Sequence, residues 1–522
     1  MKTNDDTVTA AEIVDQAGVP EPEPEPESKF DDFSDAGLAD RAIADGIGDR
    51  LCKVVGMGWI GYADKGWEPI TTDQAVEAVR VWAEEYLEAL DQAVVDAPTK
   101  ERREVAREKA VAMSNKAGAR STLKAVLGLV AGRVTTQPRE LDSYPELKQC
   151  ENGVLNLRTL ELGPNDPHLL LTKNTGTAYV PGATSPVWDK AREAFADEET
   201  ERYVQRVIGQ AVTGYPAEIV HVSMGSGSNG KSTIIDAVMA ALGGYAVRLP
   251  PSVLAGDARD RHPAELMPLQ GCRLGVAEEL PEGRHLDVAQ MKRLTDTAEV
   301  TARNMGENFV TFPATHSIMV ATNYRLIVSE PDYGTQRRLR EIPWPKTFVT
   351  DPKGPNELKS AGSGMKRKLR QRREREAVLA WIVEGAHAVL ADGGEIGDPP
   401  KAVKDATEAW LAQSNPLGTG LGELTVEDED GFIPTADVVT AAKRIYARAG
   451  MRKPNDMTIK DRIRAQAGWE RLDQDRITVG AGAWAVSVLG SAPASGKKIR
   501  GIKGRRFATS EEVDGMASDD DF

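Results

Sequence analysis

The glycine-rich segment at residues 225–233 limits the fold of this chain more than any other feature. It reads GSGSNGKST and satisfies the pattern GxxxxGK[ST]. An apolar segment typical of a strand, EIVHVSMG, precedes it, and a segment typical of a helix, STIIDAVMAAL, continues from it. This order of strand, glycine loop and helix is the context in which backbone amides surround phosphate groups. We therefore expect an α/β fold that carries a phosphate-binding loop.

The residues of this loop predict the chemistry of its ligand. Glycines allow the backbone to turn its amides inward around phosphates, and Lys231 supplies a cation to the β- and γ-phosphates. The hydroxyl of Ser232 is placed to bind magnesium. We predict ATP and Mg²⁺ as cofactors, with nine nucleotide-binding residues: Gly225, Ser226, Gly227, Ser228, Asn229, Gly230, Lys231, Ser232 and Thr233.

Composition and charge exclude several classes of protein. The chain has 522 residues, which favours roughly two to four domains. Its net charge of −15 argues against coating nucleic acid with the whole surface, but a ring or groove can still be lined locally by cations. Three distant cysteines, Cys52, Cys150 and Cys272, indicate neither a zinc site nor a disulfide framework. No apolar run reaches the length of a membrane span, and no signal peptide is visible, so we expect a cytoplasmic protein without membrane contact.

Changes in composition divide the chain into five predicted parts. These are a disordered acidic Pro/Glu tail (1–30), a mostly helical lead-in domain (31–195), an ATPase domain (196–395), a winged-helix-like domain (396–490), and a basic arm with an acidic tail (491–522). A hairpin near residues 53–70 carries Trp59, Tyr62 and Trp67, for which we predict packing beneath the helices; base stacking is the alternative. The order of helices and strands after residue 430 favours a winged helix that binds duplex or origin DNA, with protein docking as the alternative.

Three segments after the loop carry polar residues that suit ATP hydrolysis. RLGVAEEL reads as a strand that ends at Glu278 and Glu279, and HSIMVATN reads as a strand that ends at Asn323. One carboxylate can orient magnesium while the other polarises the attacking water, and the asparagine can position that water. An acidic pair at the start of a helix is the alternative for the two glutamates. GTQRRLREIPW supplies Arg337 and Arg338, either of which can reach the ATP of a neighbouring subunit as an arginine finger.

In this order the segments resemble the superfamily-three helicases. The likeness is to the helicase part of phage and plasmid primase–helicases, which are related to the poxvirus primase–helicase. The specific match is MKRLTDTAEVTARNMGENFVTFPATHSIMVATN, with a Lys-Arg-Leu-Thr start, a later arginine, an aromatic-rich strand and a Thr-Asn end. Upstream, NGVLNLRTLEL, SPVW and RVIGQAVTG resemble the lead-in domain of those proteins. The likeness spans roughly residues 45–350 and extends more loosely to 490.

The resemblance implies an α/β AAA+-like core and a ring, expected to be a homo-hexamer, that translocates 3′ to 5′ on single-stranded DNA and separates forked duplexes. Each ATP lies between subunits, and Arg338 or Arg337 completes the neighbour's site. TARNMGENFVTF is expected to form a hairpin in the channel. The predicted DNA-binding residues are Lys292, Arg293, Arg303, Asn304 and Asn308. For Lys292 and Arg293, a solvated helix face is the alternative.

The chain departs from the family pattern at three places. Asp296-Thr297-Ala298 stands where the family has Gly-Gly-Asp, and Gln336 stands where a tryptophan is common. Glu279 aligns with the family's acid better than Glu278 does, so we expect Glu279 to bind magnesium together with Ser232. No primase half is apparent, which implies a separate primase and polymerase as partners. The composition suggests a phage or prophage in a bacterial host.

Two other functions share part of these features. A DNA-packaging or transposition ATPase shares the loop and the carboxylates, but it does not predict the 291–323 segment. A replication initiator or loader uses ATP only to assemble on DNA. A motor that hydrolyses ATP is favoured over an initiator or loader by the presence of Glu279, Asn323 and Arg338.

Overall fold

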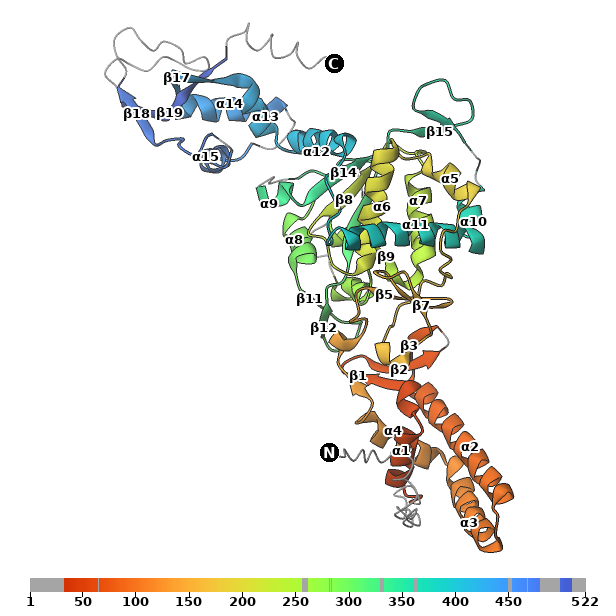
Figure 1. Cartoon of the computed structure of the whole chain (residues 1–522). Helices are drawn as coiled ribbons and strands as arrows, with labels where there is room; N and C mark the ends of the chain where they lie inside the picture. The colour runs from red at the N-terminus through yellow and green to blue at the C-terminus, as the bar shows by residue number, and fades with distance from the viewer. Residues whose placement is uncertain are drawn as a thin grey trace, which may run out of the picture. The chain divides into compact units, whose positions relative to one another are not determined.

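The computed structural model describes residues 32–63, 65–255, 262–280, 282, 284–328, 333–360, 362, 364–448, 453–466, 468–478 and 498–508, and it divides into two compact units (Figure 1). The first unit ends at Pro138, and the second comprises residues 64–66 and everything from Arg139 onward. The predicted acidic tail at 1–30 lies outside the described residues, and of the predicted basic arm and acidic tail at 491–522 only residues 498–508 are described. Within the described part of the chain, no helix has both the length and the apolar character needed to cross a bilayer.

The first unit combines long helices with a small sheet. Its helices are α1 (Asp35–Ala44), α2 (Thr72–Asp96), α3 (Lys100–Ala117) and α4 (Arg120–Ala131). The sheet, in the order β3-β2-β1-β4, contains β1 (Leu51–Val54), β2 (Gly58–Ala63), β3 (Gly66–Ile70) and β4 (Thr135–Thr136). A capping box between Thr71 and Gln74 starts α2, as the Thr/Asp signal in the sequence predicts. The prediction of packing beneath the helices is confirmed for Trp59, which is buried in the core that the helices form. Trp67 is buried as well and contacts the half-buried Tyr62 edge to face, with 5.3 Å between the ring centroids.

The second unit begins earlier than the boundary predicted near residue 195. Residues 139–195 contribute the antiparallel strands β5 (Leu147–Cys150), β6 (Gly153–Asn156) and β7 (Leu162–Gly163) and the helix α5 (Pro186–Arg192). Leu155, Leu157 and Trp188 of this segment belong to the same buried core as the helices that follow. Because their apolar side chains are buried in this core, the segment folds with the second unit.

A five-stranded sheet forms the centre of the second unit. Its strands, β8 (Val220–Met224), β9 (Ala246–Leu249), β10 (Leu274–Glu278), β13 (Ser317–Thr322) and β14 (Leu339–Pro343), lie in the order β14-β8-β13-β10-β9, and every neighbouring pair is parallel. Buried parallel strands need apolar residues on both faces, and all five residues of β10 except the terminal Glu278 are buried. The predicted α/β core is therefore confirmed.

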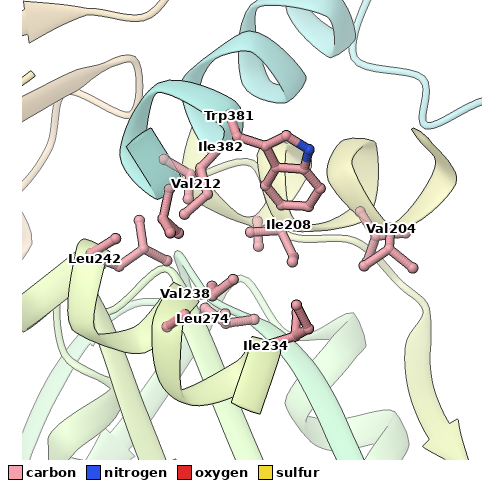
Figure 2. Packing of buried hydrophobic residues seen from close by; sticks show 14 of the residues in the cluster. Val204, Ile208, Val212, Ile234, Val238, Leu242, Leu274, Trp381 and Ile382 are labelled. Carbon is pink, nitrogen blue, oxygen red and sulfur yellow. The ribbon is translucent and has the colours of Figure 1, made fainter. Parts of the chain in front are cut away.

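Three helices pack together above this sheet. They are α6 (Glu198–Thr213), α7 (Lys231–Leu242) and α11 (Arg372–Ala391). Figure 2 shows the α6 side chains Val204, Ile208 and Val212 opposite Ile234, Val238 and Leu242 of α7, with Leu274 of β10 and with Trp381 and Ile382 of α11. Smaller elements complete this part: α8 (Val288–Asp296), α9 (Tyr333–Gln336), α10 (Met365–Leu369), β11 (Glu299–Ala302), β12 (Val310–Pro313), β15 (Thr347–Val349) and β16 (Glu357–Lys359).

The C-terminal part is a small α/β arrangement. It contains α12 (Lys401–Ser414), α13 (Pro416–Leu424), β17 (Thr425–Pro434), α14 (Thr435–Arg448), α15 (Asp456–Arg464), β18 (Asp475–Thr478) and β19 (Lys498–Phe507), with sheet order β17-β19-β18. The segment expected to be a basic arm is instead the central strand β19. Its Ile502 is buried, and its Arg505 and Arg506 pair with Glu427 and Asp428 of β17, so these cations stabilise the sheet.

The crossing of α6 and α11 generates the first prediction. A Cβ atom at Gly209 would lie 2.3 Å from the backbone carbon of Gly385, so the helices touch through their main chains. We expect Gly209→Ala to lower the free energy of unfolding by about 1–3 kcal/mol, because the helices must move apart. Urea-induced unfolding measures this change. The control is Gly422→Ala in α13, where nothing lies within 4 Å; it should stabilise by about 0.5–1 kcal/mol. Equal effects of the two variants would show that the helices do not touch in this way.

Candidate nucleotide-binding site

The phosphate-binding loop joins β8 to α7 in the predicted order. β8 ends at Met224, and α7 begins at Lys231 with Gly230 as its N-cap. Gly230 has a φ of 80°, and a Cβ atom there would lie 2.7 Å from Cβ of Ala194, so only glycine fits. The dipole of this 12-residue helix makes its first turn positive, so this end of α7 can attract an anion.

A cavity of about 390 Å³ lies at the carboxyl ends of the central strands. In an open parallel sheet this edge is where ligands bind. Its lining residues come from α7, from the ends of β9, β10 and β13, and from the region of α10: Lys231, Ser232, Asp236, Arg248, Glu278, Glu279, Ala321, Thr322, Asn323, Lys366 and Arg370. The structure thus brings together five of the predicted site residues, namely Lys231, Ser232, Glu278, Glu279 and Asn323.

Lys231 is a buried cation without a carboxylate partner in the described part of the chain. Its Nζ donates to the backbone oxygen of Thr322, to Oδ1 of Asn323 at 2.9 Å and to the backbone oxygen of Gly225 at 3.3 Å. Burial lowers the pKa of Lys231 to about 8. The charged form therefore lacks a counter-ion, and a bound anion can supply one.

The two glutamates at the end of β10 have different surroundings. The carboxylate of Glu278 pairs with Arg248, which also pairs with Asp236. Glu279 is exposed and carries no recorded side-chain partner among the described residues. Its φ of 57° is in the left-handed region, and its amide donates to the oxygen of Ala321 at 3.1 Å. Glu279 is thus the carboxylate that remains available to a cation, and with the hydroxyl of Ser232 it offers the hard oxygen ligands that Mg²⁺ prefers.

The alternative interpretation of the glutamate pair, as the start of a helix, is wrong. Glu278 is the last residue of β10, and the next α-helix in the described chain, α8, begins at Val288 with Asp287 as its N-cap. The acids therefore sit at the end of a strand, where the backbone turns sharply at Glu279.

Arg337 and Arg338 differ in their freedom to move. Arg338 is buried, and its guanidinium forms a fork with Asp296, with Nε–Oδ1 at 2.8 Å and Nη2–Oδ2 at 2.7 Å; Nη1 donates to the oxygen of Gly334. Burial acts to raise the pKa of Asp296, but hydrogen bonds from Arg338 and Thr295 hold it below its ordinary value. Arg337 is half exposed and lies 3.6 Å from Glu218.

The predicted hairpin is confirmed, because β11 and β12 pair antiparallel from Glu299–Pro313 to Ala302–Val310. Beyond the paired strands, the guanidinium of Arg303 stacks on Phe309, 4.7 Å from the ring centroid. Met305 and Phe309 are 80% and 57% exposed. Asn304 donates to Glu307, and Asn308 is exposed.

Lys292 and Arg293 lie outside the nucleotide cavity. They line a separate hollow of about 580 Å³ beside Asp296 and the start of β11. The structure therefore groups them with the hairpin rather than with the phosphate-binding loop.

Sequence reasoning missed Asp236, Arg248, Lys366 and Arg370 in the cavity and Phe309 on the hairpin. The signal for Lys366 and Arg370 was present as the basic run KRKLRQRR. The basic run lies far from the phosphate-binding loop in the sequence, so the sequence offered no reason to connect the run with the loop. For Phe309, the signal was an aromatic residue next to the turn of the hairpin.

Two families match the chain. Residues 40–195 match the family described as D5 N terminal like, and residues 223–338 match a family of unknown function, DUF5906. A protein of African swine fever virus, named as a primase, is 27% identical over 232 residues, which are 42% of this chain and 24% of that protein. A protein of Frog virus 3, named as a helicase, is 26% identical over 258 residues, which are 47% of this chain and 26% of that protein. The chain thus matches about a quarter of the length of these curated relatives.

Among solved structures, the A-form apo structure of the NrS-1 C-terminal region superposes with a TM-score of 0.48 at 11% identity. The superposition covers 91% of this chain and 100% of that one. The two viral relatives and the D5 N-terminal match confirm the sequence resemblance to the primase–helicase family.

The fork between Arg338 and Asp296 generates the second prediction. Asp296→Asn keeps the side-chain shape but removes the charge, and Arg338 then remains buried without its carboxylate. Because the Asp296 side chain is 33% exposed, we expect a loss of about 1–2 kcal/mol in the free energy of unfolding. Denaturant unfolding measures this loss. Glu218→Gln is the control, since Glu218 is 62% exposed and 3.8 Å from Arg338, and it should change stability by less than about 0.5 kcal/mol. Similar losses in both variants would contradict the assigned role of the fork.

Proposed function

We infer that this chain, which resembles the phage and viral primase–helicase-like family, is an ATP-driven DNA helicase that works in replication. The observation that carries the proposal is the cavity in which Lys231 meets Ser232, Glu279 and Asn323 at the carboxyl ends of three strands. The names of the relatives, primase and helicase, support the role in replication.

Each residue of the cavity has a proposed task in ATP hydrolysis. Lys231 and the amides at the start of α7 bind the phosphate tail, and they neutralise charge as the bond to the terminal phosphate breaks. Ser232 and Glu279 would hold Mg²⁺, which supplies charge neutralisation of the phosphate oxygens when bound. Because Glu278 is held by Arg248, we propose Glu279 as the carboxylate that polarises the attacking water. Asn323 already contacts Lys231 and is placed to orient that water.

For a ring, we propose Arg337 rather than Arg338 as the arginine finger. A finger must leave its own subunit and reach the ATP of the next one. Arg338 is buried in its fork with Asp296, whereas Arg337 is half exposed. The sequence alone left open which of the two is the finger, and the burial of Arg338 favours Arg337. The homo-hexamer and the 3′ to 5′ direction remain proposals from the family resemblance.

The hairpin is the proposed DNA-contacting element. Phe309 and Met305 are exposed apolar side chains beside the cation of Arg303, a combination that lets bases stack while the cation contacts the backbone. Asn304, Asn308, Lys292 and Arg293 supply further polar contacts in this proposal. A few cations on such a hairpin suffice to hold single-stranded DNA in a ring whose net charge is negative.

The C-terminal part supports a winged-helix proposal. Its elements follow the order helix, strand, helix, helix, strand, strand from α13 to β19. We propose that it contacts duplex DNA at the fork, with docking of a separate primase or polymerase as the second candidate. Arg505 and Arg506 pair with carboxylates within the sheet, so these two cations are less available to contact a DNA backbone.

The first test is ATP-dependent unwinding of a forked DNA duplex by the full chain. We expect unwinding by the wild type and a loss of about two orders of magnitude or more in ATP turnover for Lys231→Ala, with unwinding abolished. Lys359→Ala, an exposed lysine of β16, is the control and should behave as wild type. ATP hydrolysis without strand separation would overturn the helicase proposal in favour of a packaging ATPase or an initiator. Full activity of Lys231→Ala would overturn the site itself.

The lowered pKa of Lys231 makes nucleotide binding depend on pH. Below about pH 8 the side chain is charged and binds phosphate directly. Above that pH the free protein has lost the proton and must take it up again on binding, so affinity should fall by up to about tenfold per pH unit. Titration with a fluorescent ATP analogue between pH 7 and 9.5 measures this. Lys231→Arg stays charged and should show no such fall; equal slopes for the two proteins would contradict the assignment.

A further inference from the structure

The basic run at residues 366–376 has a location that its sequence did not suggest. Its first residues form the single turn α10, whose Leu369 is buried in the same core as α7. Lys366 and Arg370 are four residues apart, so they lie on one face of this turn, and both line the nucleotide cavity. Arg367, between them in sequence, does not line it. Two cations of this run, Lys366 and Arg370, therefore line the nucleotide cavity.

Lys366 is held by a carboxylate of α7. Its Nζ lies 2.9 Å from Oδ2 of Asp236, whose side chain is 13% exposed. Burial acts to raise the pKa of Asp236, but the hydrogen bond from Lys366 and the pairing with Arg248 hold it below its ordinary value. This ion pair fixes α10 against the helix that starts at the phosphate-binding loop.

The charges around the cavity are not all balanced. Two cations and two carboxylates alternate along a chain of ion pairs, which runs from Lys366 through Asp236 and Arg248 to Glu278. Among the charged lining residues, three remain outside that chain: Lys231, Glu279 and Arg370. Arg370 is exposed, and its side chain makes no hydrogen bond or ion pair with the described residues. If Glu279 holds a metal ion, Lys231 and Arg370 are the two cations left for the phosphates.

We propose that Arg370 is a phosphate-binding residue of the nucleotide site, supplied by the same subunit, and that Lys366 is a positioning residue that holds α10 through Asp236. The proposal rests on the proposed binding of ATP at the loop. Arg370 shares the cavity with Glu279 and with Asn323, which contacts the tip of Lys231. Because that lysine reaches the β- and γ-phosphates, Arg370 contacts the terminal phosphate and favours ATP over ADP.

The test compares the affinities of a non-hydrolysable ATP analogue and of ADP, both with Mg²⁺, for the full chain. We expect Arg370→Ala to bind the ATP analogue about 10- to 100-fold more weakly and ADP less than about threefold more weakly, since a hydrogen bond to a charged group is lost only with ATP. Arg370→Lys should recover part of the affinity because it keeps the charge. Arg367→Ala is the matched control from the same run and should bind both nucleotides as wild type does. Lys366→Ala, like Arg370→Ala, should reduce the preference for the ATP analogue over ADP. Lys366→Arg should restore that preference.

The outcomes separate this inference from the proposed function. Suppose that the wild type binds both nucleotides, that Lys231→Ala binds neither, and that Arg370→Ala binds both as the wild type does. This result would overturn the role of Arg370 alone. Equal weakening of ATP and ADP binding by Arg370→Ala would overturn its assignment to the terminal phosphate. No nucleotide binding by the wild-type chain would overturn both proposals.

Discussion

The side chain of Lys231 connects the two parts of the fold on which the site depends. Its backbone starts α7, while its ammonium group reaches the end of β13 at Thr322 and Asn323. Carbonyl and amide oxygens orient the cation without cancelling its charge, as a carboxylate would. The result is a preorganised positive centre at the start of a helix, and the other polar residues of the cavity are arranged around it.

Ion pairing determines which of the remaining charged residues are available for chemistry. Glu278 and Asp236 are engaged by Arg248, and Arg338 is engaged by Asp296. The pairs of Glu278 and of Arg338 each remove one member of a sequence-adjacent doublet from the site, and Glu279 and Arg337 are the members that remain accessible. In each doublet, one residue is held in an ion pair by a third residue and its neighbour stays available, so two adjacent residues of the same type have different roles.

The sequence predicted the parts of the site that are local. The glycine loop, the strand ends at Glu279 and Asn323, and the hairpin between β11 and β12 each follow from short patterns, because turns and strand ends leave signals in adjacent residues. The burial of Arg338 could not be predicted, because it depends on Asp296, 42 residues away. Lys366 and Arg370 were likewise out of reach, since only the packing of α10 against α7 brings the basic run to the loop. The unit boundary at Pro138 also depends on which distant core buries the strands that follow it.

The strand end that carries Asn323 also anchors the C-terminal part. Two residues later, Arg325 forms a fork with Glu341 of β14, at 3.0 Å for both contacts, and reaches Gln413 of α12. Burial raises the pKa of Glu341, and the fork with Arg325 opposes the rise. The oxygen of Leu326 accepts a hydrogen bond from Trp410 of α12, and Thr407 accepts from the amide of Glu341. Residues 323–326 thus form one short segment that connects the cavity beside Lys231 with the contacts that hold α12.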